Sequence, residues 1–233
     1  MSLSSSASAA IIPERANGAM PSQWLPSRGR ECLRRGPYRG FCQGPRRAPR
    51  PYGAAAELAK QLGLGTNKAV SHLLLQPAKP EWIEAAGPDS AQPPLFPVKG
   101  AMVWRGLQRA QRGKRKRPPH KGIDIGAREG AKIQAVQSGL VIYADNTVRG
   151  YGNLLVTLHP DGSSAMYAHC RAIYVFPGQR IARAQIVAEV GHTGIARGTH
   201  LHFEYRKDGK VRDPLKVLVG GPEVRPLELS RRP

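Results

Sequence analysis

Three short stretches decide how this chain is interpreted: His120-Lys-Gly-Ile-Asp124, Tyr167-Ala-His169 and His200-Leu-His202. Together they hold four of the seven histidines and one carboxylate. They lie in a run of short apolar segments separated by turn residues, which is typical of β-strands. Side chains two or four residues apart leave the same face of an extended strand. The two rings of His-x-His, and likewise His120 and Asp124 around a bend at Gly122, can therefore point at one centre.

Two imidazoles and one carboxylate match the protein share of a catalytic zinc site, which leaves the fourth position open for water. The sequence has no His-Glu-x-x-His stretch, so no glutamate is placed beside the metal as a general base. If four histidines converge and only two bind metal, the other two can serve as base and as stabiliser of the developing oxyanion. Imidazole suits both tasks because it titrates near neutrality.

From about residue 96 to 218, roughly half of its length, the chain resembles the LytM/lysostaphin-type zinc peptidases of the bacterial cell wall, which have the duplicated hybrid motif fold. The matching motifs, in family order, are HKGIDI (120–125), GLVIYA (139–144), GYGNL (150–154), MYAH (166–169), PGQRI (177–181), GHTG (191–194) and GTHLHFE (198–204). A single His-x-His would not be specific, but this ordered combination is.

The resemblance implies that His120, Asp124 and His202 bind Zn²⁺, and that His169 and His200 form an unligated catalytic pair facing the scissile peptide. The implied activity is that of a metalloendopeptidase acting on the peptide part of peptidoglycan. Which histidine is the base stays open. Some relatives have lost ligands and act as activators of cell-wall amidases, which is the alternative function. All five positions are filled here, and this favours an active hydrolase.

Four further residues are candidates for substrate binding. Tyr143 and Tyr167 can supply phenolic donors, and Tyr167 is expected on the same strand face as His169 because it stands two residues earlier. Packing is the alternative role for both tyrosines. His192 and Thr199 depart from the residues usual at these motif positions and are expected to line the groove, with a structural role as the alternative for His192.

The net charge of +20 draws the protein towards polyanions, so nucleic acid, anionic lipid and anionic wall polymers are candidate partners. Residues 105–117 contain seven Lys and Arg and no acid. This loop is expected either to hold anionic wall polymers near the site or to be a mobile, solvent-exposed loop without a binding role. Nucleic-acid binding through the Arg-rich N-terminal region and the helix pair that follows it ranks low, because it leaves the five-residue site unexplained.

The predicted fold is mainly β, an antiparallel sandwich or open sheet with a groove. Residues 1–53 are expected to be a disordered Arg/Pro/Gly-rich tail, and 54–93 a short helical segment, with a cap at Thr66, and a Pro-rich linker. The resemblance implies that residues 94–220 form a LytM-type zinc peptidase domain, and 221–233 are expected to be a C-terminal tail. The helical segment weakly resembles a helix-turn-helix or the helices of a LysM module, and a plain helical spacer is preferred.

The resemblance implies a place in the cell envelope, periplasmic or extracellular. No apolar run approaches the length of a membrane-spanning helix. Residues 1–10 lack a basic n-region, so no convincing signal peptide is present, and we expect the start of the sequence to be misassigned.

Two other residues carry structural expectations. Cys170, one of three cysteines, is expected to be a small buried thiol. His159 stands in a His-Pro-Asp-Gly turn and is expected at the surface.

Overall fold

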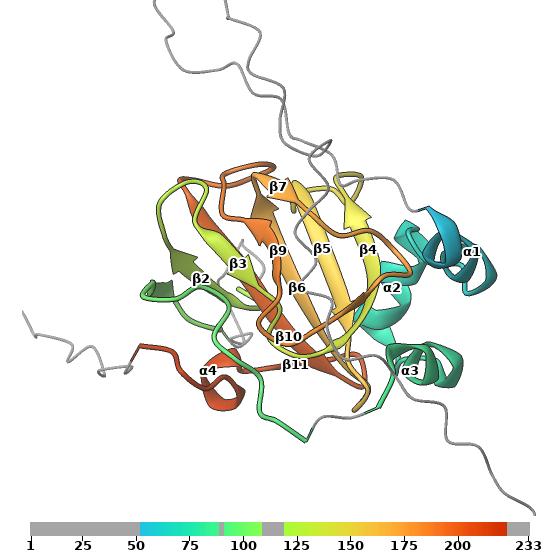
Figure 1. Cartoon of the computed structure of the whole chain (residues 1–233). Coiled ribbons are helices and arrows are strands. Elements are labelled where there is room, and N and C mark those ends of the chain that lie inside the picture. Colours follow the sequence, from blue (N-terminus) through green and yellow to red (C-terminus); the bar gives the residue numbers. More distant parts are fainter. Residues whose placement is uncertain (1–51, 89–90, 109–118, 223–233) are drawn as a thin grey trace, which may run out of the picture. The chain divides into compact units, whose positions relative to one another are not determined.

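The computed structural model describes residues 52–88, 91–108 and 119–222, all of which belong to the compact unit Gln43–Pro233 (Figure 1). Most of the two predicted tails and residues 109–117 of the predicted basic loop lie outside the described residues. All five residues of the predicted metal and catalytic site lie within them.

The fold of the described residues is mainly antiparallel β, as predicted, with an eight-stranded and a three-stranded sheet (Figure 1). In the larger sheet the order is β1-β2-β10-β6-β5-β4-β8, and β11 pairs with β10. Its strands are β1 (Met102–Arg105), β2 (Ile123–Gly126), β4 (Gly139–Asp145), β5 (Asn153–Leu158), β6 (Ser163–Cys170), β8 (Arg180–Ile181), β10 (His200–Lys207) and β11 (Lys210–Arg212). The smaller sheet has the order β3-β9-β7, with β3 (Lys132–Gln134), β9 (Ile186–Glu189) and β7 (Ala172–Ile173).

One hydrophobic core lies between the two sheets. Leu201 and Phe203 of β10 belong to the same buried cluster as Ile133 of β3 and Val187 of β9. Because side chains alternate along a strand, the intervening positions of β10, which include His200 and His202, leave the opposite face of the larger sheet. The sandwich therefore places the predicted site on the sheet face that points away from the smaller sheet.

A second core fills the space between that outer face and three helices, α1 (Gly53–Gln61), α2 (Asn67–Leu75) and α3 (Pro80–Ala86). The predicted cap is confirmed, since Thr66 Oγ1 accepts a hydrogen bond of 3.2 Å from Ala69 N. Val70, Leu73 and Trp82 are almost fully buried in a cluster shared with β4, β5 and β6. Figure 1 shows the three helices gathered beside β4. The helical segment is therefore packed against the sheet, and the expectation of a plain spacer is wrong.

Polar contacts also attach the helices to the sheet. Gly65 N donates to Ile142 O at 2.8 Å, and the Arg180 side chain on β8 donates through Nε to Ala85 O at 2.9 Å. A short fourth helix, α4 (Pro214–Val217), follows β11. Among the described residues, none of the helices has the length and apolarity that crossing a membrane requires.

His159 corrects a sequence-based expectation. Its side chain is fully buried, its Nδ1 donates to Ser138 O at 3.1 Å, and its ring stacks on Tyr205 with the ring centroids 6.4 Å apart. Burial lowers the pKa of His159 to about 4. The turn position suggested the surface, but the ring is buried between Ser138 O and the Tyr205 ring. Cys170 is a buried free thiol, as predicted.

Candidate metal centre

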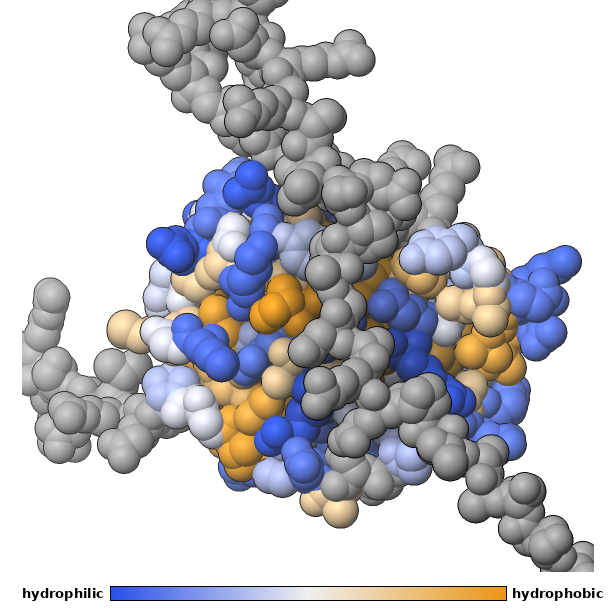
Figure 2. Space-filling view, in the orientation of Figure 1, coloured by the Kyte–Doolittle hydropathy of each residue, from blue (hydrophilic) through white to orange (hydrophobic). Residues whose placement is uncertain are grey.

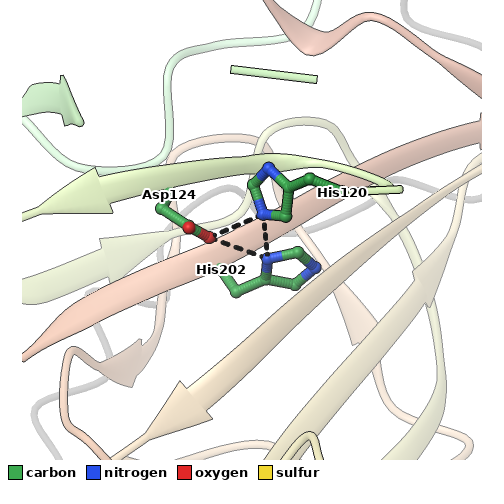
Figure 3. Close-up of side chains that lie close together, drawn as sticks. All are labelled: His120, Asp124 and His202. Carbon is green, nitrogen blue, oxygen red and sulfur yellow. Dashed lines mark hydrogen bonds and ion pairs between the residues drawn. The ribbon is translucent and has the colours of Figure 1, made fainter. Parts of the chain in front are cut away.

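Three side-chain atoms meet in a small triangle above β2 and β10 (Figure 3). His120 Nε2 lies 2.9 Å from Asp124 Oδ1 and 3.0 Å from His202 Nδ1, and the last two atoms are 2.9 Å apart. Tetrahedral zinc holds N and O ligands at about 2.0–2.2 Å, which places them roughly 3.3 Å from one another. One ion can therefore contact all three atoms after small side-chain adjustments, so the residues fit a zinc ion.

Strand register builds the triangle. Asp124 of β2 stands directly opposite His202 of β10 in the antiparallel pair, so both side chains leave the same face. Gly122 lets the chain before β2 approach β10, because a Cβ at this position would lie only 2.2 Å from Phe203 O. The sequence predicts a bend at Gly122, and the structure shows why glycine is required there: the backbone passes too close to β10 for a side chain. This close approach places His120 over β2 and β10.

The outer nitrogens of the two candidate ligand histidines are held by acceptors. His120 Nδ1 donates to Gly106 O at 2.9 Å, and His202 Nε2 donates to Glu204 Oε1 at 3.2 Å. With the outer nitrogen engaged in this way, each ring can offer its inner nitrogen to a metal once that nitrogen has lost its proton. Metal-binding histidines usually have such a partner on the other ring nitrogen, which fixes the tautomer and the ring orientation.

The charges of the site favour a cation. Burial raises the pKa of Asp124, but hydrogen bonds from His120 and His202 outweigh burial and hold that pKa well below its usual range. Burial lowers the pKa of His202, but the carboxylates of Asp124 and Glu204 outweigh it and raise the pKa to about 9. Two negative groups thus stabilise positive charge at the position where a metal would sit.

The two remaining histidines of the predicted site lie beside the triangle. His169 and His200 have ring centroids 4.9 Å apart, and His200 Nε2 is 3.7 Å from Asp124 Oδ1. His169 Nδ1 donates to Thr193 O at 2.8 Å, and His200 Nδ1 donates to Gly198 O at 2.9 Å. Both Nδ1 atoms are thus engaged by backbone carbonyls. Burial lowers the pKa of His169 to about 4, so this ring is neutral at neutral pH.

The sequence of the β domain matches the family described as Peptidase family M23 over residues 118–214. This part of the chain belongs to peptidase family M23. The M23 domain is 42% identical to "Murein hydrolase activator NlpD" of Escherichia coli (strain K12) and 41% identical to "Lipoprotein NlpD/LppB homolog" of Pseudomonas aeruginosa. Both matches run over 99 residues, or 42% of this chain, and span only 26% and 33% of those proteins.

A longer match reaches beyond the M23 domain. "Uncharacterized lipoprotein YgeR" of Escherichia coli (strain K12) is 33% identical over 174 residues, which are 70% of this chain and 66% of that protein. Among solved structures, a zinc containing peptidase from Vibrio cholerae is similar to this chain, with 30% sequence identity and a TM-score of 0.48. The match covers 54% of this chain and 40% of the chain of that peptidase.

The backbone of His169 explains how its ring comes to lie beside His200 and His202. Its backbone has φ 62°, the left-handed region that non-glycine residues rarely adopt. This conformation interrupts the strand alternation at the end of β6. Tyr167, two residues earlier, therefore lies in the core between the sheets, where its hydroxyl accepts a 3.0 Å hydrogen bond from Val136 N. The expectation that Tyr167 and His169 share a face is wrong.

The other proposed substrate-binding residues differ in placement. Tyr143 is 1% exposed, and its hydroxyl is hydrogen-bonded to Thr147 beneath the helices, so the structure supports packing for Tyr143 as it does for Tyr167. His192 is exposed and Thr199 is half-buried, and their contact with substrate stays a prediction.

An aromatic side chain beside the site has no role in the sequence-based interpretation. Trp104 is 61% exposed, and its ring centroid lies 6.4 Å from that of His200. The ring lies against Gly126, where a Cβ would be 1.8 Å from it. Trp104 and Met102 border a cleft of about 590 Å³. Figure 2 shows hydrophobic residues interspersed with hydrophilic ones on the face that it presents. Trp104 thus supplies apolar surface next to the histidines.

Two buried charged residues of β10 are also missing from the sequence-based interpretation, Glu204 and Arg206, which are 1% and 4% exposed. The two-residue period that links His200 and His202 continues to both positions. That period is the signal that could have found them.

Proposed function

We propose that the M23 domain is a zinc metalloendopeptidase that hydrolyses peptide bonds in peptidoglycan stem peptides or crossbridges. The observation that carries the proposal is the triangle of His120 Nε2, Asp124 Oδ1 and His202 Nδ1 with edges of 2.9–3.0 Å. Two further histidines, His169 and His200, lie beside it with their Nδ1 atoms bound to backbone carbonyls. Family M23 membership supports the hydrolase class.

His120, Asp124 and His202 would hold the Zn²⁺, which when bound polarises a carbonyl and lowers the pKa of water to about 7. His169 and His200 divide the remaining tasks. One accepts a proton at Nε2 from the attacking water. The other, when protonated at both ring nitrogens, donates a hydrogen bond from Nε2 to the oxygen that gains negative charge. The carbonyl oxygens that bind both Nδ1 atoms keep the rings in place for either task.

We propose the cell envelope as the place of action, periplasmic or extracellular. Support comes from relatives whose names describe them as lipoproteins or as a murein hydrolase activator. The polybasic loop 105–117 is proposed to attract anionic wall polymers towards the groove, by virtue of its charge. Of this loop the structure describes residues 105–108, and there Arg105 Nη1 lies 4.0 Å from Asp124 Oδ2.

The test is digestion of purified peptidoglycan, with the released fragments identified by mass. Wild type is expected to release peptide-cleaved fragments, and His169→Ala to lose this activity while still binding zinc. Asp124→Ala is expected to lose both. His72→Ala, a histidine on α2, serves as the matched control and is expected to digest like wild type. Equal release from wild type and His169→Ala would remove the proposed mechanism.

One observation favours a second function: the Escherichia coli relative is named "Murein hydrolase activator NlpD". The alternative is therefore a non-catalytic activator of a cell-wall amidase. It predicts that the purified protein releases no fragments alone but stimulates an added amidase, and that Asp124→Ala stimulates as well as wild type. The enzyme proposal predicts zinc-dependent release without any added amidase.

A further inference from the structure

A chain of polar contacts runs from one proposed zinc ligand to a helix outside the M23 match. It begins at His202 on β10, continues through Glu204 and Arg206 on the same strand face, and ends at the carbonyl oxygen of Leu74 in α2. Residues 202, 204 and 206 lie in line because alternate side chains of a strand share a face.

Glu204 is the centre of this chain, and both of its carboxylate oxygens are occupied. Oε1 accepts from His202 Nε2 at 3.2 Å and from the Tyr151 hydroxyl at 3.0 Å. Oε2 accepts from Arg206 Nε at 2.9 Å and from Arg206 Nη2 at 2.7 Å. A forked contact of this kind holds the carboxylate plane in one orientation. The direction of the Glu204–His202 hydrogen bond is thereby defined.

Arg206 is itself held by the helical segment. Its Nη1 donates to Leu74 O at 3.2 Å and to Gly209 O at 3.4 Å. Leu74 lies in the last turn of α2, where carbonyl oxygens lack partners within the helix and attract positive charge. The turn between β10 and β11 lies against the end of α2, since a Cβ on Gly209 would be 2.6 Å from Gln76 N. The helix end therefore completes the environment of the buried guanidinium.

Removing either Glu204 or Arg206 would disturb the whole series of polar contacts from His202 to Leu74 O. A buried carboxylate or guanidinium without its partner is strongly unfavourable, so the neighbouring groups would move to compensate. If Arg206 lost its hold, Glu204 would be free to rotate and His202 would lose the contact that orients its ring. Outer partners of this kind commonly change metal affinity by 10–100-fold.

We propose that Arg206 and Glu204 are positioning residues of the zinc site, and that docking of α2 on the sheet sets zinc affinity through them. This inference rests on the zinc site of the proposed function. The helical segment Gly53–Ala86 would then contribute to zinc binding, although the family match begins only at residue 118.

The experiment measures zinc affinity of the full chain by competition with a chelating dye, in Arg206→Gln, Glu204→Gln and Arg180→Gln. The first two are expected to bind zinc about 10–100-fold more weakly than wild type. Arg180→Gln is the matched control, because Arg180 also joins the sheet to a helix carbonyl but does not contact Glu204. Its zinc affinity is expected to equal that of wild type. A folded Arg206→Gln or Glu204→Gln with wild-type affinity would overturn the proposal.

A second measurement tests the same proposal without the Arg206→Gln variant, and so does not depend on whether that variant folds. Coupling between two sites is reciprocal, so zinc should stabilise α2 as α2 supports zinc. Amide hydrogen exchange in residues 67–75 of wild type is expected to slow on adding zinc, and not to slow in Asp124→Ala. Zinc that binds wild type without changing exchange in α2 would sink this inference alone. Failure of wild type to bind zinc would sink the proposed function instead.

Discussion

His159 is a buried imidazole whose neutral form the fold prefers, and this has a consequence for acid stability. Its pKa is about 4 in the folded protein, against 6.5 for an exposed ring. As the pH falls below 6.5, His159 becomes protonated in the unfolded chain but stays neutral in the folded protein. The free energy of unfolding therefore declines between about pH 6.5 and 4. The loss is on the order of 3 kcal/mol, at about 1.4 kcal/mol per pKa unit.

His159→Asn isolates this contribution, since the asparagine amide can replace the donor to Ser138 O and does not titrate. Unfolding by denaturant, followed at pH 7 and at pH 4.5, is expected to show a smaller acid-induced loss of unfolding free energy in the variant. Identical pH dependence in the two proteins would show that His159 does not carry the effect. His169, whose pKa is also lowered to about 4, titrates in both proteins and cancels in the comparison.

Gly122 is expected to tolerate no side chain. In Gly122→Ala the new methyl would lie 2.2 Å from Phe203 O, so β2 and β10 would have to separate. We expect the free energy of unfolding to fall by about 1–3 kcal/mol, together with weaker zinc binding. Thermal unfolding and zinc titration check the two effects. Gly198→Ala, where a Cβ meets nothing within 4 Å, is the control and is expected to fold like wild type.

Helix α2 offers a matched pair of leucines that separates docking from helix formation. Leu73 is 4% exposed in the core shared with the sheet, whereas Leu75 is 78% exposed. Leu73→Ala is expected to lower the free energy of unfolding by about 2–5 kcal/mol, because it leaves a cavity in that core. Leu75→Ala is expected to stay within about 0.5 kcal/mol of wild type. Denaturant unfolding measures both, and equal values would mean that α2 is not docked in solution.

The strands show which elements can be predicted from the local sequence pattern and which cannot. Apolar runs between turn residues predict strands over residues 132–136, 139–144, 153–158, 164–169, 186–190 and 201–205. The structure has β3, β4, β5, β6, β9 and β10 there, with bounds that agree to within two residues. The stretch 123–126 is predicted only as an extended segment, and it becomes β2 through pairing with β1 and β10. β7 and β8 are two residues long and carry no periodic signal of their own. Strands of this length are defined by their partners.

Zinc is expected to stabilise the folded protein as a whole, since the three proposed ligands come together only on folding. Free zinc at 100 times its dissociation constant would add about 2.7 kcal/mol to the free energy of unfolding. Removing zinc with a chelator should lower the Tm of wild type, and adding zinc back should restore it. Asp124→Ala should show no response, and a zinc-dependent shift in this variant would place the ion at another site.

The sequence alone determined the five residues of the candidate site and the antiparallel β class, because residue type, spacing and strand period are local properties of the chain. Only the tertiary structure decided that Tyr143 and Tyr167 lie in cores, that the His169 ring turns towards His200, and that Leu74 O of α2 accepts a hydrogen bond from Arg206. These outcomes depend on contacts between segments far apart in the chain. A local pattern contains no information about the partner that will bury a tyrosine, hold a left-handed backbone or satisfy a buried charge.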